Sequence, residues 1–370
     1  MKSVGIGIVG CGNVFDIYMR GLISDSHVRV VRCADIDLAR AREAAGRHNI
    51  PAHGTVDELL QDPGVEVVVN LTPPTVHMEV TEAALKAGKH VYSEKPLALD
   101  LDSVRKAIAL AGTTGRRLGA APDTFLGGAA QTARAVLDEG RIGAPVAATA
   151  FFVHHRAESW HPDPTHLFKP GGGPVLDLGP YYISLLVSCL GPVAEVASMS
   201  HTGQKRRVVT APNRRVEVVE AEVATHSAAL LRFVSGAVCV VQLSFDVWDA
   251  HLPFVEIYGT KGAMSLADPN GYDGDVLIKM KEGTSWDPVS PVMPPQAAHG
   301  SGDQFRRGLG VADLATAIRT GVPHSTGPDF VYHVLEVLLA IETSERSAAV
   351  TQIASRCERP RSMANTAAHA

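Results

Sequence analysis

The first 122 residues alternate short apolar runs with longer segments in which apolar positions recur at helical spacing. The runs have the length and β-branched character of buried strands, and they are Val4–Val9, Val28–Ala34, Val65–Leu71 and His90–Ser93. The segments of helical spacing are Asn13–Ile23, Asp37–Asn49, Thr75–Ala87 and Leu101–Gly112. This alternation is typical of a parallel sheet with helices on both faces. It predicts an α/β domain, a doubly wound Rossmann sheet, over residues 1–122.

From Asp123 onward the pattern changes to strand-like runs joined by short glycine-containing turns. These runs are Val146–His154, Val193–Ser200, Val216–His226, Ala228–Phe233, Ala237–Asp246, Phe254–Gly259 and Gly262–Leu266. Helical spacing recurs at Gln131–Glu139, Pro180–Leu190, Phe305–Thr320 and Asp329–Ser347. The pattern predicts an α+β domain over residues 123–355, built on a large open sheet that is mainly antiparallel. We expect the polar segment 356–370 to be a loose tail.

Length, charge and cysteine content exclude several classes of protein. A chain of 370 residues is long enough for two domains, and a net charge of -5 without a basic block argues against nucleic-acid binding. No apolar run approaches the ~20 residues that span a bilayer, so we expect no membrane segment. The five cysteines are scattered without a Cys-x-x-Cys pair, which is typical of free thiols in a reducing compartment. We therefore expect a cytoplasmic protein.

A glycine-rich turn follows the first strand, where a dinucleotide-binding fold places its phosphate loop. Gly10 permits a tight turn, and Gly12 lets the backbone approach a pyrophosphate at the start of the next helix. The cofactor-binding candidates of this loop are Gly10, Gly12, Asn13 and Val14. Phe15 stands where a third glycine is usual, a position that governs packing rather than phosphate contact. A glycine turn without a ligand is the alternative for the loop taken alone.

Asp35 completes the fingerprint, because it ends the second strand about twenty residues beyond the glycine loop. A carboxylate there is suited to the ribose 2′-hydroxyl of NAD. Neither Ile36 nor Asp37 can neutralise the 2′-phosphate of NADP. The sequence therefore favours NAD over NADP as cofactor.

Three further motifs resemble those of the glucose–fructose oxidoreductase / inositol dehydrogenase / rhizopine catabolism (Gfo/Idh/MocA) family. They are Thr72-Pro73-Pro74-Thr75-Val76-His77, Ser93-Glu94-Lys95-Pro96 and Gly171-Gly172-Gly173-Pro174-Val175-Leu176-Asp177-Leu178-Gly179. The resemblance runs over nearly the whole chain. It implies a Rossmann domain, then a domain with an open sheet that binds substrate and forms dimers or tetramers. It also implies a nicotinamide-dependent oxidoreductase of sugars, inositols or related polyols, with cofactor contacts from Thr72, Pro73, His77, Glu94 and Lys95.

The same resemblance assigns three catalytic candidates, Lys95, Asp177 and Tyr181. An ammonium at Lys95 can orient the reacting hydroxyl and stabilise its alkoxide, and the Lys95–Pro96 peptide is a candidate cis bond. The family's Asp-x-Gly-x-His motif reads Asp177-Leu178-Gly179-Pro180-Tyr181 here, with tyrosine in place of histidine. We expect Tyr181 to act as general acid/base, with Lys95 as its electrostatic partner and Asp177 as a substrate anchor. A solvated lysine and a packed aromatic ring are the alternatives for Lys95 and Tyr181.

Four histidines lie between His154 and His166, beside Trp160. Their spacing does not match a helical metal site, and adjacent strand positions face opposite ways, so we expect no metal. A loop over a sugar pocket fits better, with Trp160 stacking on a ring and Arg156 or His161 binding hydroxyls. The glycines at 171–173 would let this loop pass close to the substrate. An ordinary surface loop is the alternative, and Asp123, with Thr124, is a weaker substrate-binding candidate.

Together these features predict an NAD-dependent dehydrogenase or reductase of a sugar, inositol or glycoside. Within this class, a ketosugar reductase and an oxidoreductase that retains its cofactor are alternatives. Outside it, the alternative is a non-catalytic nicotinamide-sensing regulator on the same fold. The presence of Glu94, Lys95 and Asp177 favours an enzyme.

Overall fold

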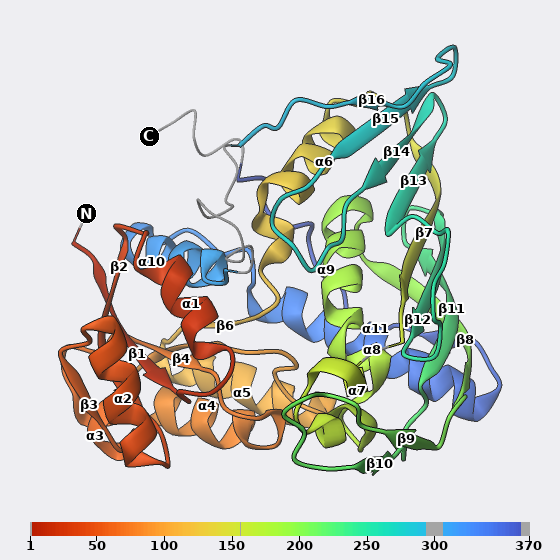
Figure 1. Cartoon of the computed structure of the whole chain (residues 1–370). Coiled ribbons are helices and arrows are strands. Elements are labelled where there is room, and N and C mark those ends of the chain that lie inside the picture. The colour runs from red at the N-terminus through yellow and green to blue at the C-terminus, as the bar shows by residue number, and fades with distance from the viewer. Residues whose placement is uncertain (1, 156, 294–305, 364–370) are drawn as a thin grey trace. The chain divides into compact units, whose positions relative to one another are not determined.

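A computed structural model describes residues 2–155, 157–293 and 306–363 of the chain (Figure 1). Two compact units divide it, of which unit 1 is Met1–Leu126 with Ala297–Tyr332 and unit 2 is Gly127–Gln296 with His333–Ala370. The helix α11 (Pro328–Ser347) contains the boundary between Tyr332 and His333. No helix in the described ranges is both long and apolar enough to cross a bilayer.

Unit 1 is built on a parallel sheet of six strands in the order β3-β2-β1-β4-β5-β6. The strands are β1 (Val4–Val9), β2 (Val28–Ala34), β3 (Ala52–Gly54), β4 (Val67–Asn70), β5 (His90–Ser93) and β6 (Leu118–Ala120). Every residue of β1 and β4 is buried, as expected where helices cover both faces of a sheet. The order is that of a Rossmann fold, so the predicted architecture is confirmed.

The helices of unit 1 differ in how their ends are capped. They are α1 (Phe15–Leu22), α2 (Leu38–His48), α3 (Val56–Gln61), α4 (His77–Lys86), α5 (Leu101–Thr114) and α10 (Leu309–Thr320), with the 3₁₀ turns η1 (Pro74–Val76) and η2 (Thr124–Leu126). Asp37 caps α2 and Asp100 caps α5, while Gly115 ends α5 in the left-handed conformation. The sequence analysis missed the short elements β3, α3 and β6, whose apolar patterns are too brief to detect.

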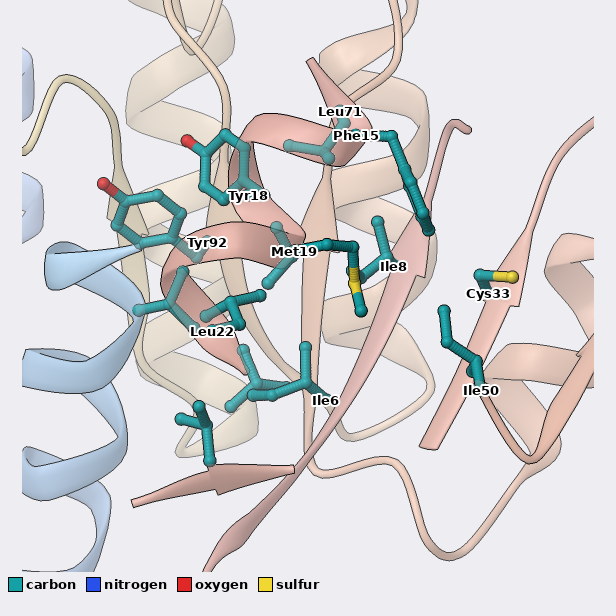
Figure 2. Close-up of a cluster of buried hydrophobic side chains, with 14 of the residues drawn as sticks. Ile6, Ile8, Phe15, Tyr18, Met19, Leu22, Cys33, Ile50, Leu71 and Tyr92 are labelled. Carbon is teal, nitrogen blue, oxygen red and sulfur yellow. The ribbon is translucent and has the colours of Figure 1, made fainter. Parts of the chain in front are cut away.

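The helix α10 joins unit 1, although the sequence analysis placed it beyond a single boundary at residue 122. Its side chains Val311, Leu314 and Ala315 are buried in the same core as β1 and α1. Figure 2 shows part of this core, with Ile6 and Ile8 of β1 beside Met19 of α1. The helix therefore belongs to unit 1 because of its apolar face, and its place in the chain does not determine this. Phe305, the predicted start of the helix, lies outside the described residues.

Unit 2 contains a nine-stranded sheet in the order β16-β15-β14-β13-β7-β12-β11-β8-β17. The strands are β7 (Pro145–Val153), β8 (Val193–His201), β11 (His226–Phe233), β12 (Val238–Ser244), β13 (Val255–Gly259), β14 (Gly262–Leu266), β15 (Val276–Met280), β16 (Asp287–Pro288) and β17 (Thr351–Gln352). Within this sheet β7 and β12 pair in parallel, and the other neighbours pair antiparallel. The predicted open, mainly antiparallel sheet is confirmed.

One predicted strand of unit 2 is wrong. The run Val216–His226 contains only the short strand β10 (Val218–Glu220), which pairs with β9 (Arg206–Val208) in a separate hairpin. On either side of β10, Arg215 N–H donates to the Pro162 carbonyl at 2.7 Å and Glu222 N–H to the Phe168 carbonyl at 2.8 Å. The backbone at Arg215 and Glu222 therefore bonds to a loop, while Glu217 and Ala221 extend the pairing with the β9 side of the hairpin.

Helices cover one face of the large sheet and leave the other open (Figure 1). The helical elements of unit 2 are α6 (Gly128–Asp138), α7 (Ala157–Trp160), α8 (Gly173–Asp177), α9 (Gly179–Leu190) and the 3₁₀ turn η3 (Pro164–Phe168). All residues of α9 are buried, so this helix fills the core of the unit. On the open face, Met199, Leu230 and Val240 are 81%, 50% and 41% exposed.

The segment 356–363 is held against α6, which corrects the expectation of a loose tail. Arg134 of α6 donates to the Pro360 carbonyl at 2.8 Å, and Arg359 forms an ion pair with Asp138 at 2.7 Å. Gln131 accepts a hydrogen bond from Met363 N–H at 2.7 Å. Polar side chains of α6 therefore hold this segment, and the polarity of the sequence alone cannot reveal that contact. Residues 364–370 lie outside the described part.

Candidate functional site

The carboxyl ends of the unit 1 strands form one aligned row. Val9 pairs with Ala34 and with Asn70, Asn70 pairs with Ser93, and Ser93 pairs with Ala120. The residues that follow these positions therefore lie side by side, and they are Gly10, Asp35, Leu71, Glu94 and Ala121. Backbone hydrogen bonds of 2.8–2.9 Å continue the ladder through Gly10, Leu71, Glu94 and Ala121. Ligands of open parallel sheets bind at this edge.

The glycine loop has room for a ligand where the fingerprint requires it. Gly10 has φ 97°, and a Cβ atom there would lie 2.8 Å from the backbone of Leu71, so only glycine fits. A Cβ atom at Gly12 would meet no atom within 4 Å, which leaves the backbone open to close approach. Phe15 is fully buried and packs edge-on against His48 with ring centroids 5.7 Å apart. Its ring thus packs α1 against α2, where families with a third glycine use close backbone contact.

The Asp35 carboxylate is fixed by hydrogen bonds from the backbone on both sides. Cys11 N–H donates to its Oδ2 at 2.8 Å and Asp37 N–H to its Oδ1 at 2.9 Å, and the residue is 6% exposed. The half-exposed Arg40 lies 3.3 Å from the Asp35 Oδ1, an ion pair that the sequence analysis missed. Such a rigid acceptor beside the glycine loop is suited to a ribose hydroxyl.

His77 differs from the prediction of a direct cofactor contact, because its ring is occupied inside the protein. It is 1% exposed, with Nδ1 2.7 Å from the Pro96 carbonyl and Nε2 2.6 Å from the Thr72 carbonyl. Burial lowers the pKa of His77, although both carbonyl contacts oppose this shift. Asn70, which the sequence analysis also missed, accepts from Thr72 Oγ1 at 2.6 Å and donates to the His77 carbonyl at 2.9 Å. The histidine and asparagine therefore position the Thr72–Pro73 loop.

Glu94 and Lys95 directly follow β5, and two hydrogen bonds hold the glutamate side chain. Glu94 accepts from Tyr18 Oη at 2.7 Å and from Lys95 N–H at 2.9 Å, and Lys95 is half-buried. Burial, together with the charge of Glu94, raises the pKa of Tyr18 well above its usual value. The Lys95–Pro96 peptide is cis, as predicted. Tyr18 escaped the sequence analysis because a tyrosine at helical spacing has the pattern of a core residue.

The structure places one oxygen of the Asp123 carboxylate at the start of a helix, and the predicted substrate contact of this residue stays a prediction. The residue is fully buried, and its Oδ2 accepts from Gly308 N–H at 3.0 Å and Gly310 N–H at 2.9 Å. These are orphan donors at the start of α10, where a negative charge is also favourable. Its neighbour Thr124 is 2% exposed. Both residues therefore belong to the interior of unit 1.

Asp177 and Tyr181 lie on either side of the junction between α8 and α9 in unit 2. Asp177 is the last residue of α8, and Pro180 lies in the first turn of α9, where its missing N–H has no cost. Tyr181 N–H donates to the Leu178 carbonyl at 3.1 Å, which closes the junction. Asp177 is half-buried and Tyr181 is 8% exposed. Asp177 therefore ends one helix and Tyr181 lies in the first turn of the next.

The predicted sugar loop contains an exposed indole and a pair of histidines. Trp160 is 60% exposed, with its ring edge-on to His161 at 5.2 Å, and His161 lies 5.1 Å from His166. Asp163 N–H donates to His161 Nδ1 at 3.1 Å, and burial lowers the pKa of His161. Arg156 lies outside the described residues. Across the described ranges, no three potential metal ligands are grouped.

The triple glycine makes a close contact within the protein. A Cβ atom at Gly172 would lie 2.4 Å from the His166 carbonyl oxygen. Gly173 has φ 80°, a conformation that glycine adopts without strain. These glycines therefore let the chain pass beneath the loop on its way to α8.

Comparisons with known proteins agree with this arrangement. Residues 4–121 match the family model described as "Oxidoreductase family, NAD-binding Rossmann fold", and residues 130–265 match the "GFO/IDH/MocA C-terminal domain". The chain is 30% identical to trans-1,2-dihydrobenzene-1,2-diol dehydrogenase of Bos taurus over 85% of this chain and 86% of that protein. It is 29% identical to 1,5-anhydro-D-fructose reductase of Ensifer adhaerens over 91% and 95% of the two chains. An NAD-binding oxidoreductase of Klebsiella pneumoniae has a similar structure, with TM-score 0.80, 25% identity, and coverage of 96% of this chain and 100% of that one.

Proposed function

Because the chain belongs to the GFO/IDH/MocA family of NAD-binding oxidoreductases, we propose that it transfers hydride between nicotinamide and a ring hydroxyl or ketone of a sugar, inositol or glycoside. The observation that carries the proposal is the aligned row at the carboxyl edge of unit 1, which holds Gly10, Asp35 and Glu94 side by side. The substrates named for the bovine and Ensifer relatives are also rings with hydroxyl or ketone groups.

The residues of this row fit a dinucleotide. Gly10, Gly12, Asn13 and Val14 lead into the N-terminus of α1, which favours the pyrophosphate, and the fixed Asp35 carboxylate accepts from the ribose. When bound, NAD supplies the hydride acceptor or donor of the reaction. Thr72, Pro73 and Glu94 line the same edge.

The candidates for the chemical step are Lys95, Tyr181 and Asp177. The Lys95 ammonium orients the reacting oxygen and stabilises the negative charge that develops on it. Tyr181 Oη exchanges the proton of that oxygen, and the Asp177 carboxylate accepts a hydrogen bond from a neighbouring hydroxyl. Trp160 covers the apolar face of the ring, while His161 binds a further hydroxyl. Asp123 and His77 support the site from inside unit 1.

The test is a Lys95→Ala substitution, assayed by nicotinamide absorbance across a panel of aldoses, inositols and glycosides. We expect the natural protein to reduce NAD with one group of these compounds. Loss of the ammonium should lower turnover by about 10²–10³-fold, with NAD affinity unchanged. Lys86→Ala on α4, whose side chain is 63% exposed, is the matched control and should behave as the natural protein does. Full turnover in the Lys95 variant would show that the assigned mechanism is wrong.

A ketosugar reductase is the second candidate, favoured by the name of the Ensifer relative. It predicts oxidation of NADH by cyclic keto-sugars and silence in the oxidative panel. An enzyme that retains its cofactor would instead be purified with nicotinamide bound. A sensor would bind NAD without turnover of any substrate in either direction.

The open face of the unit 2 sheet supports assembly into a homodimer or homotetramer. A groove of about 680 Å³ lies on this face, lined by residues that include Met199, Leu230, Val240 and Val350. Exposed apolar side chains gathered on one sheet face are typical of a protein interface. The five cysteines are free thiols, which supports a cytoplasmic location.

A further inference from the structure

The hairpin β9–β10 forms backbone hydrogen bonds with the proposed sugar loop along its length. Backbone N–H groups of Thr210 and Ala211 donate to the Glu158 carbonyl at 2.8 and 2.9 Å. The contacts of Arg215 with Pro162 and of Glu222 with Phe168, described above, hold the middle and the end of the same loop. Because these bonds involve only backbone atoms, they fix the path of the loop but not the direction of its side chains.

A buried arginine of this hairpin adds the side-chain contacts. The Arg207 side chain is fully buried, and its guanidinium binds Glu158 Oε1, Asp246 Oδ1 and the Phe245 carbonyl, the last two at 2.5 and 2.9 Å. Its Cζ also lies 4.8 Å from the centre of the Phe168 ring. One planar cation therefore joins α7, η3 and the end of β12. Burial favours the neutral form of Asp246, but hydrogen bonds from Thr225 and Arg207 outweigh it, so the pKa of Asp246 lies below its usual value.

Each carboxylate bound by Arg207 lies two residues before an exposed tryptophan. Glu158 precedes Trp160, which is 60% exposed, and Asp246 precedes Trp248, which is 68% exposed. Trp248 is stacked on His155, with ring centroids 3.8 Å apart and an angle of 17° between the planes. The sequence analysis did not select Trp248, because nothing local distinguishes it from any tryptophan in a loop. Exposed indoles packed against histidine rings, as Trp160 and Trp248 are, are suited to the apolar faces of sugar rings.

We infer that Arg207 is a positioning residue that fixes Trp160 and Trp248 as two stacking surfaces of one substrate site. This inference rests on the proposed function, and it adds Trp248 as a second contact for an extended substrate such as a glycoside. An arginine is required because its fork binds two carboxylates at once, whereas the single ammonium of a lysine does not reproduce that geometry.

The first test compares Arg207→Lys with Arg206→Met, its neighbour on β9 with a 70% exposed side chain. Arg207→Lys keeps the buried positive charge, so it avoids the unpaired carboxylates that an Arg207→Met substitution would leave. We expect Arg207→Lys to raise the KM for the glycoside by about tenfold to a hundredfold. The KM for NAD should stay close to that of Arg206→Met, although the melting temperature should fall because a buried ion pair is weakened. A uniform loss of stability, NAD binding and turnover would instead show a merely structural role and overturn the inference.

A second test examines the two carboxylates bound by Arg207 separately, and it does not depend on turnover. Glu158→Gln and Asp246→Asn are each placed in proteins that retain one tryptophan, Trp160 or Trp248, with phenylalanine at the other tryptophan positions. We expect Glu158→Gln to change acrylamide quenching of Trp160, and Asp246→Asn to change that of Trp248. Unchanged quenching in both variants would overturn the inference while leaving the proposed function intact. If the natural protein turns over no sugar, the proposed function fails and the quenching result still decides the positioning role.

Discussion

At the scale of a residue, the adjacent tyrosines Tyr181 and Tyr182 differ in the role that we propose for each, catalysis for the first and packing for the second. Tyr182 is fully buried, its Oη donates to Asp268 at 3.2 Å, and burial raises its pKa far above the usual value. Tyr181 follows Pro180 at the start of α9, four residues after Asp177. The sequence singles out Tyr181 only through its place in the motif.

Tyr181→Phe should lower kcat by about 10²–10⁴-fold, the usual contribution of a general acid/base. Tyr182→Phe is the matched control and should keep full activity while losing about 1 kcal/mol of stability with its hydrogen bond. Steady-state kinetics and urea unfolding measure the two effects. Unchanged kcat in Tyr181→Phe would identify that ring as packing only.

At the scale of elements, side chains distant in sequence fix where helices and strands meet. Asp123 holds the start of α10 across 185 residues, and His333 of α11 accepts from Val193 N–H of β8 at 3.0 Å across 140 residues. Neither contact has a local signal. Gly10 and Asp35, in contrast, were identified from sequence because a strand end, a turn and a helix start lie within a few residues.

Asp123→Asn tests the helix contact against the predicted substrate contact. Loss of the charge at the start of α10 should lower the free energy of unfolding by about 1 kcal/mol, with the substrate KM unchanged. Asp102→Asn is the control, since this residue also lies in a first helical turn but is 75% exposed. A raised KM with unchanged stability would restore Asp123 to the substrate site.

His333 predicts how the stability of the protein depends on pH. Burial lowers its pKa from 6.5 to about 4, and its Nε2 accepts a hydrogen bond, so the folded protein holds the neutral ring. The unfolded chain binds a proton near pH 6.5, so the stabilisation is complete above that pH and is lost as the pH falls towards 4. His333→Gln can still accept the bond without titrating. Thermal melts between these pH values should therefore be flatter for the variant, and an equally steep dependence would contradict the assignment.

At the scale of the whole molecule, each unit carries part of the proposed chemistry. Unit 1 carries Gly10, Asp35 and Glu94 in the aligned row, with Lys95 directly after Glu94, and unit 2 carries Asp177 and Tyr181. Unit 2 also carries the exposed sheet face. Along β11 and most of β12, buried side chains alternate with more exposed ones, so the sheet packs a core on one side and presents apolar groups such as Leu230 and Val240 on the other.

Met199→Glu combined with Leu230→Glu should convert the proposed oligomer to monomers, because a desolvated interface cannot hold unpaired charges. Leu38→Glu, at a 50% exposed position of α2, is the control. Size-exclusion chromatography with light scattering measures the mass. An unchanged oligomer in the double variant would place the interface elsewhere.

The sequence by itself determined the Rossmann fold, the glycine loop, the family motifs and most strands of the second sheet. These follow from side-chain periodicity and turn chemistry, which act over a few neighbouring residues. Only the tertiary structure decided that α10 belongs to unit 1, that His77 and Asp123 face inward, and that Arg207 joins two tryptophan-bearing segments. Burial and hydrogen-bond partners at these positions depend on segments tens to hundreds of residues apart, and no local pattern encodes which of them meet.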